Sequence, residues 1–119
     1  MGNHIYYARY LDLMEEARGE FFRRAGVPFL QLQNEDTIFP VIECHIRFKA
    51  PARYDDVLDI AVWVTAMEGV RLNFGYRITA ADERLIVEAE TRHVCTALNE
   101  KPKRVPEKLS AALSPFAKA

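Results

Sequence analysis

The 119-residue sequence lacks the features that mark a membrane protein or a nucleic-acid-binding protein. It has no apolar run close to the ~20 residues that a transmembrane helix needs, and no basic segment leading into an apolar one, as in a signal peptide. Its formal net charge is −1, so it lacks the basic excess that favours binding to nucleic acid or to an anionic membrane. We therefore expect neither nucleic acid nor membrane among its partners.

Cysteine is also scarce, and its placement limits the chemistry of the protein. Cys44 and Cys95 lie far apart and do not have the spacing of a disulfide framework. We expect both to be reduced, small apolar side chains of the core, in a cytoplasmic protein. Each has a histidine nearby, His45 or His93, and the four side chains are of the types that bind zinc. However, adjacent strand residues such as Cys44 and His45 point to opposite faces, so we expect no metal and no cofactor.

Several catalytic motifs are missing as well. The sequence contains no GxSxG nucleophile motif, no recognisable Ser/His/Asp order and no glycine-rich phosphate loop. It also has no internal repeat, low-complexity tract or linker. Half of the residues are hydrophobic and 28% are charged, which is typical of a globular protein. The length is that of one domain, residues 1–119.

A long amphipathic helix is predicted over residues 4–25. Apolar side chains fill about half of the helical wheel and charged side chains occupy the rest. Gly26, followed by Val27 and Pro28, is a typical helix stop. So broad an apolar face predicts a sheet that curves around the helix. The apolar positions are Tyr6, Tyr7, Tyr10, Leu11, Leu13, Met14, Ala17, Phe21, Phe22 and Ala25.

Beyond this helix the hydrophobic period changes to two, the period of a strand. Four strands are predicted, at residues 41–48, 57–67, 70–80 and 85–98, each with one apolar and one polar face. Because the connections are too short for crossover helices, we expect an antiparallel meander. Residues 106–113 are predicted to form a short helix. One long helix against one side of an antiparallel sheet is an α+β fold.

The start of the long helix is the first candidate site. Asn3 is a good N-cap, and the free backbone N–H groups of the first turn would point out beyond it. Together with the helix dipole they suit a carbonyl oxygen that gains negative charge. Gly2 has no Cβ, so a ligand can approach its backbone closely. The local sequence fits a simple helix cap equally well.

Charged residues supply two further candidates. Arg18 falls within the apolar arc of the helix, where a charge needs a partner or a route to water. It either reaches solvent at a subunit interface or pairs with a carboxylate that fixes the helix against a neighbouring chain. Lys101, Lys103 and Arg104 follow the last strand and suit the phosphates of a ligand. A solvated loop explains these three residues as well.

Four segments, in order along nearly the whole chain, carry a family resemblance: "GNHIYYARYLDLMEEAR", "PVIECHIRFKAPARYDDVLDI", "FGYRI" and "RHVCTALNEKPKRVP". In this order and spacing they resemble the hotdog-fold acyl-CoA thioesterases of the 4-hydroxybenzoyl-CoA thioesterase type. The resemblance implies a long helix wrapped by a curved antiparallel sheet, with the first strand of the family missing here. It also implies hydrolysis of an acyl-CoA substrate, and a homodimer or homotetramer with sites at the subunit interface.

The resemblance also assigns catalytic residues. The family motif is Asp-x-x-Gly-His/Ile-Val followed by Tyr, in which the Asp acts as nucleophile or general base and the helix start polarises the thioester carbonyl. Gly2 matches the motif glycine, Asn3 and His4 follow it, and Tyr7 matches an aromatic residue of the first helical turns. Glu16 matches the helix glutamate that precedes the arginine of the family.

One departure from the family pattern affects catalysis. The position of the family Asp lies three residues before Gly2, ahead of Met1, which is then interpreted as an internal methionine of an Asp-x-Met-Gly run. The alternative function is a non-catalytic protein that binds acyl-CoA or an acyl carrier. A hotdog dehydratase is a third possibility, but the three histidines do not form a recognisable dehydratase arrangement.

Overall fold

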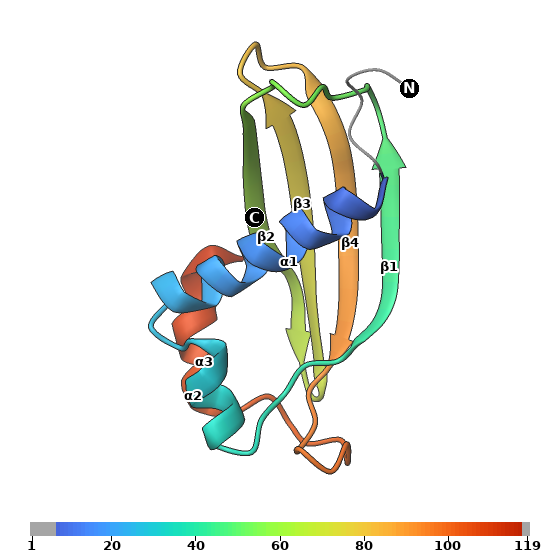
Figure 1. Cartoon of the computed structure of the whole chain (residues 1–119). Coiled ribbons are helices and arrows are strands. Elements are labelled where there is room, and N and C mark those ends of the chain that lie inside the picture. Colours follow the sequence, from blue (N-terminus) through green and yellow to red (C-terminus); the bar gives the residue numbers. More distant parts are fainter. Residues whose placement is uncertain (1–6, 118–119) are drawn as a thin grey trace.

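A long helix lies across one face of a four-stranded sheet in the computed structural model, which describes residues 7–117 (Figure 1). The outer face of the sheet is turned away from this helix. Two short helices lie near the C-terminal end of this long helix; one comes directly after it in the sequence and the other comes after the sheet. The elements are α1 (Tyr7–Arg24), α2 (Phe29–Asn34), β1 (Val41–Phe48), β2 (Leu58–Glu68), β3 (Arg71–Ala80), β4 (Leu85–Val94), α3 (Glu107–Leu113) and the 3-10 helix η1 (Ser114–Phe116).

All strand pairs are antiparallel, in the order β1-β4-β3-β2. Strands β2, β3 and β4 form the predicted meander, and Gly69, with a φ of 62°, makes the turn from β2 to β3. The meander prediction is wrong for β1, which pairs with β4 instead of β2. Because β1 and β2 are three positions apart, the connection must cover ~14 Å. Residues 49–57 are long enough to do so.

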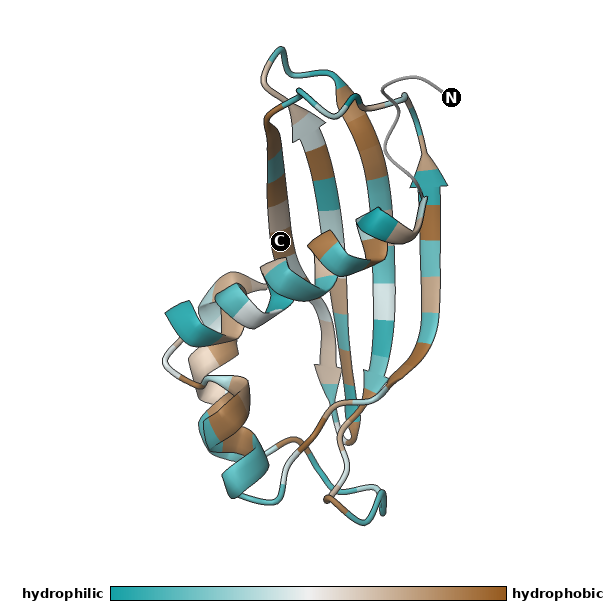
Figure 2. Ribbon diagram, in the orientation of Figure 1, coloured by the Kyte–Doolittle hydropathy of each residue, from teal (hydrophilic) through white to brown (hydrophobic). Residues whose placement is uncertain are grey.

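Helix α1 ends where the sequence predicted, since Gly26 adopts a φ of 84° after Arg24. Tyr10, Met14 and Phe22 of this helix are buried against the sheet. The inward side chains of the strands complete the core, and the alternation along the strands is visible in Figure 2. The most buried of them are Val64, Leu72, Phe74, Tyr76, Ile78, Ile86 and Val87.

The sequence did not indicate α2. This six-residue helix begins directly after Pro28, and Leu32 is its only buried residue. One buried side chain gives no hydrophobic period from which a helix can be recognised. The other short helix, α3, was predicted and is confirmed at Glu107–Leu113.

The outer face of the sheet is polar around a single tryptophan. The Trp63 ring lies against Gly75, where an added Cβ would come within 2.5 Å of it. The guanidinium of Arg77 lies over the same ring, 5.7 Å from its centroid. Arg92 forms ion pairs with Glu43 and Glu90 at 3.2 and 3.1 Å. These contacts make the outer face of the sheet largely charged, as the sequence predicted. The burial of both Asn73 and Phe74 shows that β3 is covered on both faces along part of its length.

The two cysteines have different environments. Cys95 is fully buried, as expected, whereas Cys44 is exposed, so the core prediction is wrong for Cys44. The reason is that β1 is an edge strand and its inward side chains are poorly covered, with Ile42 59% exposed. None of the helices within residues 7–117 is both long and apolar enough to cross a membrane.

Candidate functional site

Gly2, Asn3 and His4 lie outside the described residues, so their predicted role at the helix start stays a prediction. Tyr7 is described and is the first residue of α1. Its side chain is 72% exposed, and its ring centroid lies 4.6 Å from that of Phe48, the last residue of β1. Phe48 thus lies against Tyr7, the described residue among those that the sequence predicted for a site at the start of the helix.

Tyr7 and Phe48 form an exposed pair of contacting rings, which we call the aromatic shelf. The Phe48 ring meets Tyr10 edge to face at 5.6 Å, and Tyr10 is only 2% exposed. Burial raises the pKa of the Tyr10 phenol. Phe48 is also held by its backbone, which pairs with Val87 of β4. The shelf is thus supported from beneath by the core while its upper surface remains open.

The second arrangement in the candidate site is polar and lies under the middle of α1. Arg18 Nη1 donates to the Tyr76 hydroxyl at 2.9 Å, and this hydroxyl lies 2.7 Å from Thr91 Oγ1. Thr91 Oγ1 in turn lies 2.8 Å from His93 Nε2, while His93 Nδ1 lies 3.0 Å from the carbonyl oxygen of Phe39. We call Arg18, Tyr76, Thr91 and His93 the core relay.

The direction of every hydrogen bond in the core relay follows from its two ends. The Phe39 carbonyl can only accept, so His93 Nδ1 carries the hydrogen, and Nε2 of the neutral ring accepts from Thr91. Thr91 then accepts from Tyr76, and Tyr76 accepts from Arg18. Burial, assisted by the Arg18 charge, lowers the pKa of His93 from 6.5 to about 4 and so keeps the ring neutral.

The core relay gives Arg18 a partner within its own chain. The sequence left open either a route to solvent or a carboxylate of a neighbouring chain; the structure shows a half-buried side chain bonded to a phenol of its own chain. Arg18 forms no ion pair with any carboxylate in residues 7–117. Burial raises the pKa of Tyr76, so the phenol stays neutral beside the cation.

The residues considered for zinc do not converge. His45 lies on the outer face, 3.7 Å from Glu43, and His93 belongs to the core relay. Cys44 lies on the inward face of the edge strand β1, and Cys95 is buried beyond the end of β4. Across the part of the chain that the structure describes, no group of three or more metal-ligating side chains forms.

The predicted phosphate-binding residues fall into two groups. The Lys103 amine is held 3.1 Å from both the Asp36 carbonyl oxygen and the Thr37 hydroxyl, so it fastens the loop before β1. Lys101 and Arg104 are exposed. Arg104 also lines an open cleft of about 620 Å³ between the β2–β3 turn and α3. The structure thus leaves Lys101 and Arg104, but not Lys103, directed to the surface.

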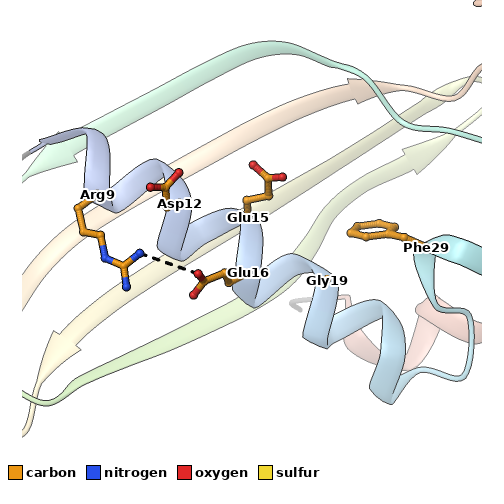
Figure 3. Close-up of a pocket in the computed structure, with 6 residues that line it drawn as sticks. All are labelled: Arg9, Asp12, Glu15, Glu16, Gly19 and Phe29. Atoms are coloured by element: carbon orange, nitrogen blue, oxygen red, sulfur yellow. Dashed lines mark ion pairs between the residues drawn. The ribbon is translucent and has the colours of Figure 1, made fainter.

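Glu16 lies in a groove on the side of α1 that faces away from the sheet (Figure 3). The groove, of about 370 Å³, runs past Gly19 to Phe29. Arg9 lies 3.9 Å from Glu16, as the dashed line in Figure 3 marks. Tyr7 precedes Glu16 by nine residues, or ~13 Å of helix. Glu16 therefore does not join the aromatic shelf of its own chain.

A family model described as the thioesterase-like superfamily matches residues 1–113. The chain belongs to this family. This thioesterase-family chain is 36% identical over 111 residues to the acyl-CoA thioester hydrolase YbgC of Escherichia coli O157:H7, covering 92% of the chain and 83% of that protein. The resemblance seen in the sequence is confirmed.

Solved structures place the thioesterase-family chain in the same fold. A hypothetical protein from Thermus thermophilus superposes with a TM-score of 0.88 at 32% identity, over 96% of this chain and 87% of that one. A 1,4-dihydroxy-2-naphthoyl-CoA thioesterase from Synechocystis superposes with a TM-score of 0.84 at 25% identity, over 93% and 83% of the two chains. The predicted α+β hotdog fold is thereby confirmed.

Sequence reasoning missed two parts of this site. Phe48 was assigned to an apolar strand face, and nothing in the period of a strand shows which end of it meets the start of a helix. Thr91 and His93 occupy inward positions in β4, next to apolar neighbours. Polar residues at inward positions of a strand are the signal that could have indicated a buried network, because buried polar groups need partners.

Proposed function

We propose that this chain hydrolyses acyl-CoA thioesters to a free acid and CoA. The observation that carries the proposal is the 36% identity, over 92% of the chain, to a protein named acyl-CoA thioester hydrolase. In the proposed net reaction the oxygen of a water molecule bonds to the acyl carbon and the carbon–sulfur bond breaks. One proton of that water goes to the CoA thiolate, and the other goes with the acid or is released from it. The family match, residues 1–113, supports the same reaction class.

The proposed mechanism needs two kinds of group, namely hydrogen-bond donors for the carbonyl oxygen and a carboxylate. Backbone N–H groups at Gly2, Asn3 and His4 would polarise the thioester carbonyl, and one such donor is often worth ~3 kcal/mol in the transition state. Tyr7 would border the same place. A carboxylate is needed to attack the carbonyl or to activate water. The family motif puts this group three residues before Gly2.

Assembly, CoA binding and location form part of the same proposal. An exposed edge strand such as β1 favours pairing with a second copy, and we propose a homodimer or homotetramer with sites at the subunit interface.

Lys101 and Arg104 would meet the phosphates of CoA, with Lys103 holding the loop nearby. The free thiols fit a reducing compartment, and we place the protein in the cytoplasm.

Thiol release from a panel of acyl-CoAs tests the proposed hydrolysis. Three forms are compared: the chain as printed, a chain with Asp-Ala added before Met1, and a matched chain with Asn-Ala there. The added Asp stands three residues before Gly2. We expect the Asp form to release thiol at least ~100-fold faster than the Asn form, because the Asn cannot act as base or nucleophile.

A non-catalytic acyl-CoA-binding protein is the second candidate function. The position of Glu16 favours it, since the α1 carboxylate that matches the family lies on the side away from the sheet. If all three forms bind acyl-CoA and none releases thiol, the hydrolase proposal fails and the binding protein remains. Equal activity in the Asp and Asn forms would instead overturn the role of the upstream carboxylate.

A further inference from the structure

The aromatic shelf is an apolar surface at the start of α1. Tyr7 is 72% exposed and Phe48 46% exposed, yet their ring centroids are only 4.6 Å apart. Two aromatic rings that remain open to solvent lose little conformational entropy when a ligand covers them, because the core already fixes one of them. Tyr10, at 2% exposure, holds Phe48 from below.

The shelf lies close to the place where the thioester carbonyl is proposed to bind. Tyr7 follows His4 by three residues, and three residues of chain span at most ~11 Å whatever their conformation. An acyl group of several carbons, starting at a carbonyl near His4, can therefore reach Tyr7 and Phe48. An acetyl group has a single methyl group beyond the carbonyl, so it can cover far less of the two rings.

We propose that Phe48 is a specificity-determining residue of this site, and that the acyl group of the substrate lies on the aromatic shelf. This inference rests on the proposed hydrolysis of acyl-CoA. Its chemical content is that the preferred acyl group is apolar and several carbons long. Phe48 supplies apolar area directly and also supports the Tyr7 ring. The carbonyl chemistry itself does not involve Phe48.

Substitution of Phe48 separates acyl groups large enough to cover the shelf from an acetyl group, which offers it a single methyl group. The variants are Phe48→Ala and Phe48→Leu, assayed with benzoyl-CoA, hexanoyl-CoA and acetyl-CoA in the Asp-extended form. In Phe48→Ala we expect kcat/KM to fall ~10- to 100-fold for the two larger substrates and less than ~2-fold for acetyl-CoA. Phe48→Leu keeps an aliphatic surface, so hexanoyl-CoA loses less than benzoyl-CoA.

Leu30→Ala is the matched control. Leu30 is 70% exposed on α2, away from the start of α1, so it removes a similar apolar side chain without touching the shelf. We expect no change in the ratio of kcat/KM between hexanoyl-CoA and acetyl-CoA. An equal loss with all three substrates in Phe48→Ala would overturn the inference, because it would show an effect through the fold alone. No loss with any substrate would overturn it too.

A binding measurement keeps this inference distinct from the proposed hydrolysis. S-hexyl-CoA and S-ethyl-CoA are thioethers that cannot be hydrolysed, and calorimetry gives their dissociation constants. We expect wild type to prefer the hexyl thioether at least ~10-fold and Phe48→Ala to lose most of this preference. Hexyl preference without thiol release would overturn the hydrolysis but support the shelf. Failure of wild type to bind either thioether would overturn both proposals.

Discussion

The start and the middle of α1 contact the sheet in opposite ways. At the start, the aromatic shelf is exposed, apolar and joined by ring contacts. In the middle, the core relay is polar, and Tyr76, Thr91 and His93 are 1%, 3% and 0% exposed. Each of these buried groups has its partner, which is the condition for placing polar side chains in a core. We infer that the relay mainly fixes the helix to the sheet, whereas the shelf remains available for a ligand.

Thr91→Val should have the largest effect on stability, since it cuts the relay at its centre while keeping the side-chain shape. The Tyr76 hydroxyl then has no acceptor and His93 Nε2 no donor, both in a buried place. We expect the free energy of unfolding in urea to fall by about 3 kcal/mol. Thr65→Val is the control, because Thr65 is exposed on the outer face of the sheet. Equal losses in the two variants would contradict the relay.

Acid should lower the free energy of unfolding, over a pH range set by the pKa of His93 in the folded and unfolded states. Its pKa is lowered from 6.5 to about 4 in the folded protein, so between these values the unfolded chain binds more protons. Stability is therefore full above about pH 6.5 and is lost as the pH falls toward 4, by up to ~3 kcal/mol.

Denaturant titrations at several pH values check the acid effect. His93→Gln should flatten the dependence between pH 4 and 6.5, since the titrating ring is removed. His45→Gln should leave it unchanged, because His45 is exposed on the outer face. A wild-type free energy of unfolding that is constant over this range would contradict the neutral, buried state of His93.

Tyr76→Phe should have a smaller effect than Thr91→Val. Arg18 is only half-buried and can donate to water instead, and Thr91 can still donate to His93. We expect a loss of about 1 kcal/mol in the free energy of unfolding. If this variant is as unstable as Thr91→Val, then Arg18 depends on the phenol more strongly than its exposure indicates. Comparison of the two urea midpoints decides this.

Tyr7→Ala should have the smallest effect on stability and a clear effect on function. The side chain is 72% exposed, so we expect a change of less than ~0.5 kcal/mol in the free energy of unfolding. The shelf loses half of its surface, so kcat/KM for hexanoyl-CoA should fall while that for acetyl-CoA changes less. A large loss of stability would show that contacts at the start of α1 contribute as much to the free energy of unfolding as those in its middle.

The elements could be predicted where the hydrophobic period was regular. The end of α1 and the bounds of β2 and β3 were close to those observed, because each of these elements follows a regular apolar period. The last strand was predicted four residues too long, ending at Leu98 instead of Val94, since the apolar run continues past the paired residues. The pairing of β1 with β4 was missed, because strand order depends on where a loop crosses the sheet.

The sequence by itself determined the family, the helix-on-sheet architecture and the candidate residues at the helix start. These follow from local period, turn residues and motif order. Only the tertiary structure decided that Cys44 is exposed, that Arg18 bonds to Tyr76, and that Phe48 meets Tyr7. Cys44 is exposed because strand order puts β1 at the edge of the sheet. In the other two cases the partners are far apart in the chain, and they come together only through the register of the strands and the path of α1 across them.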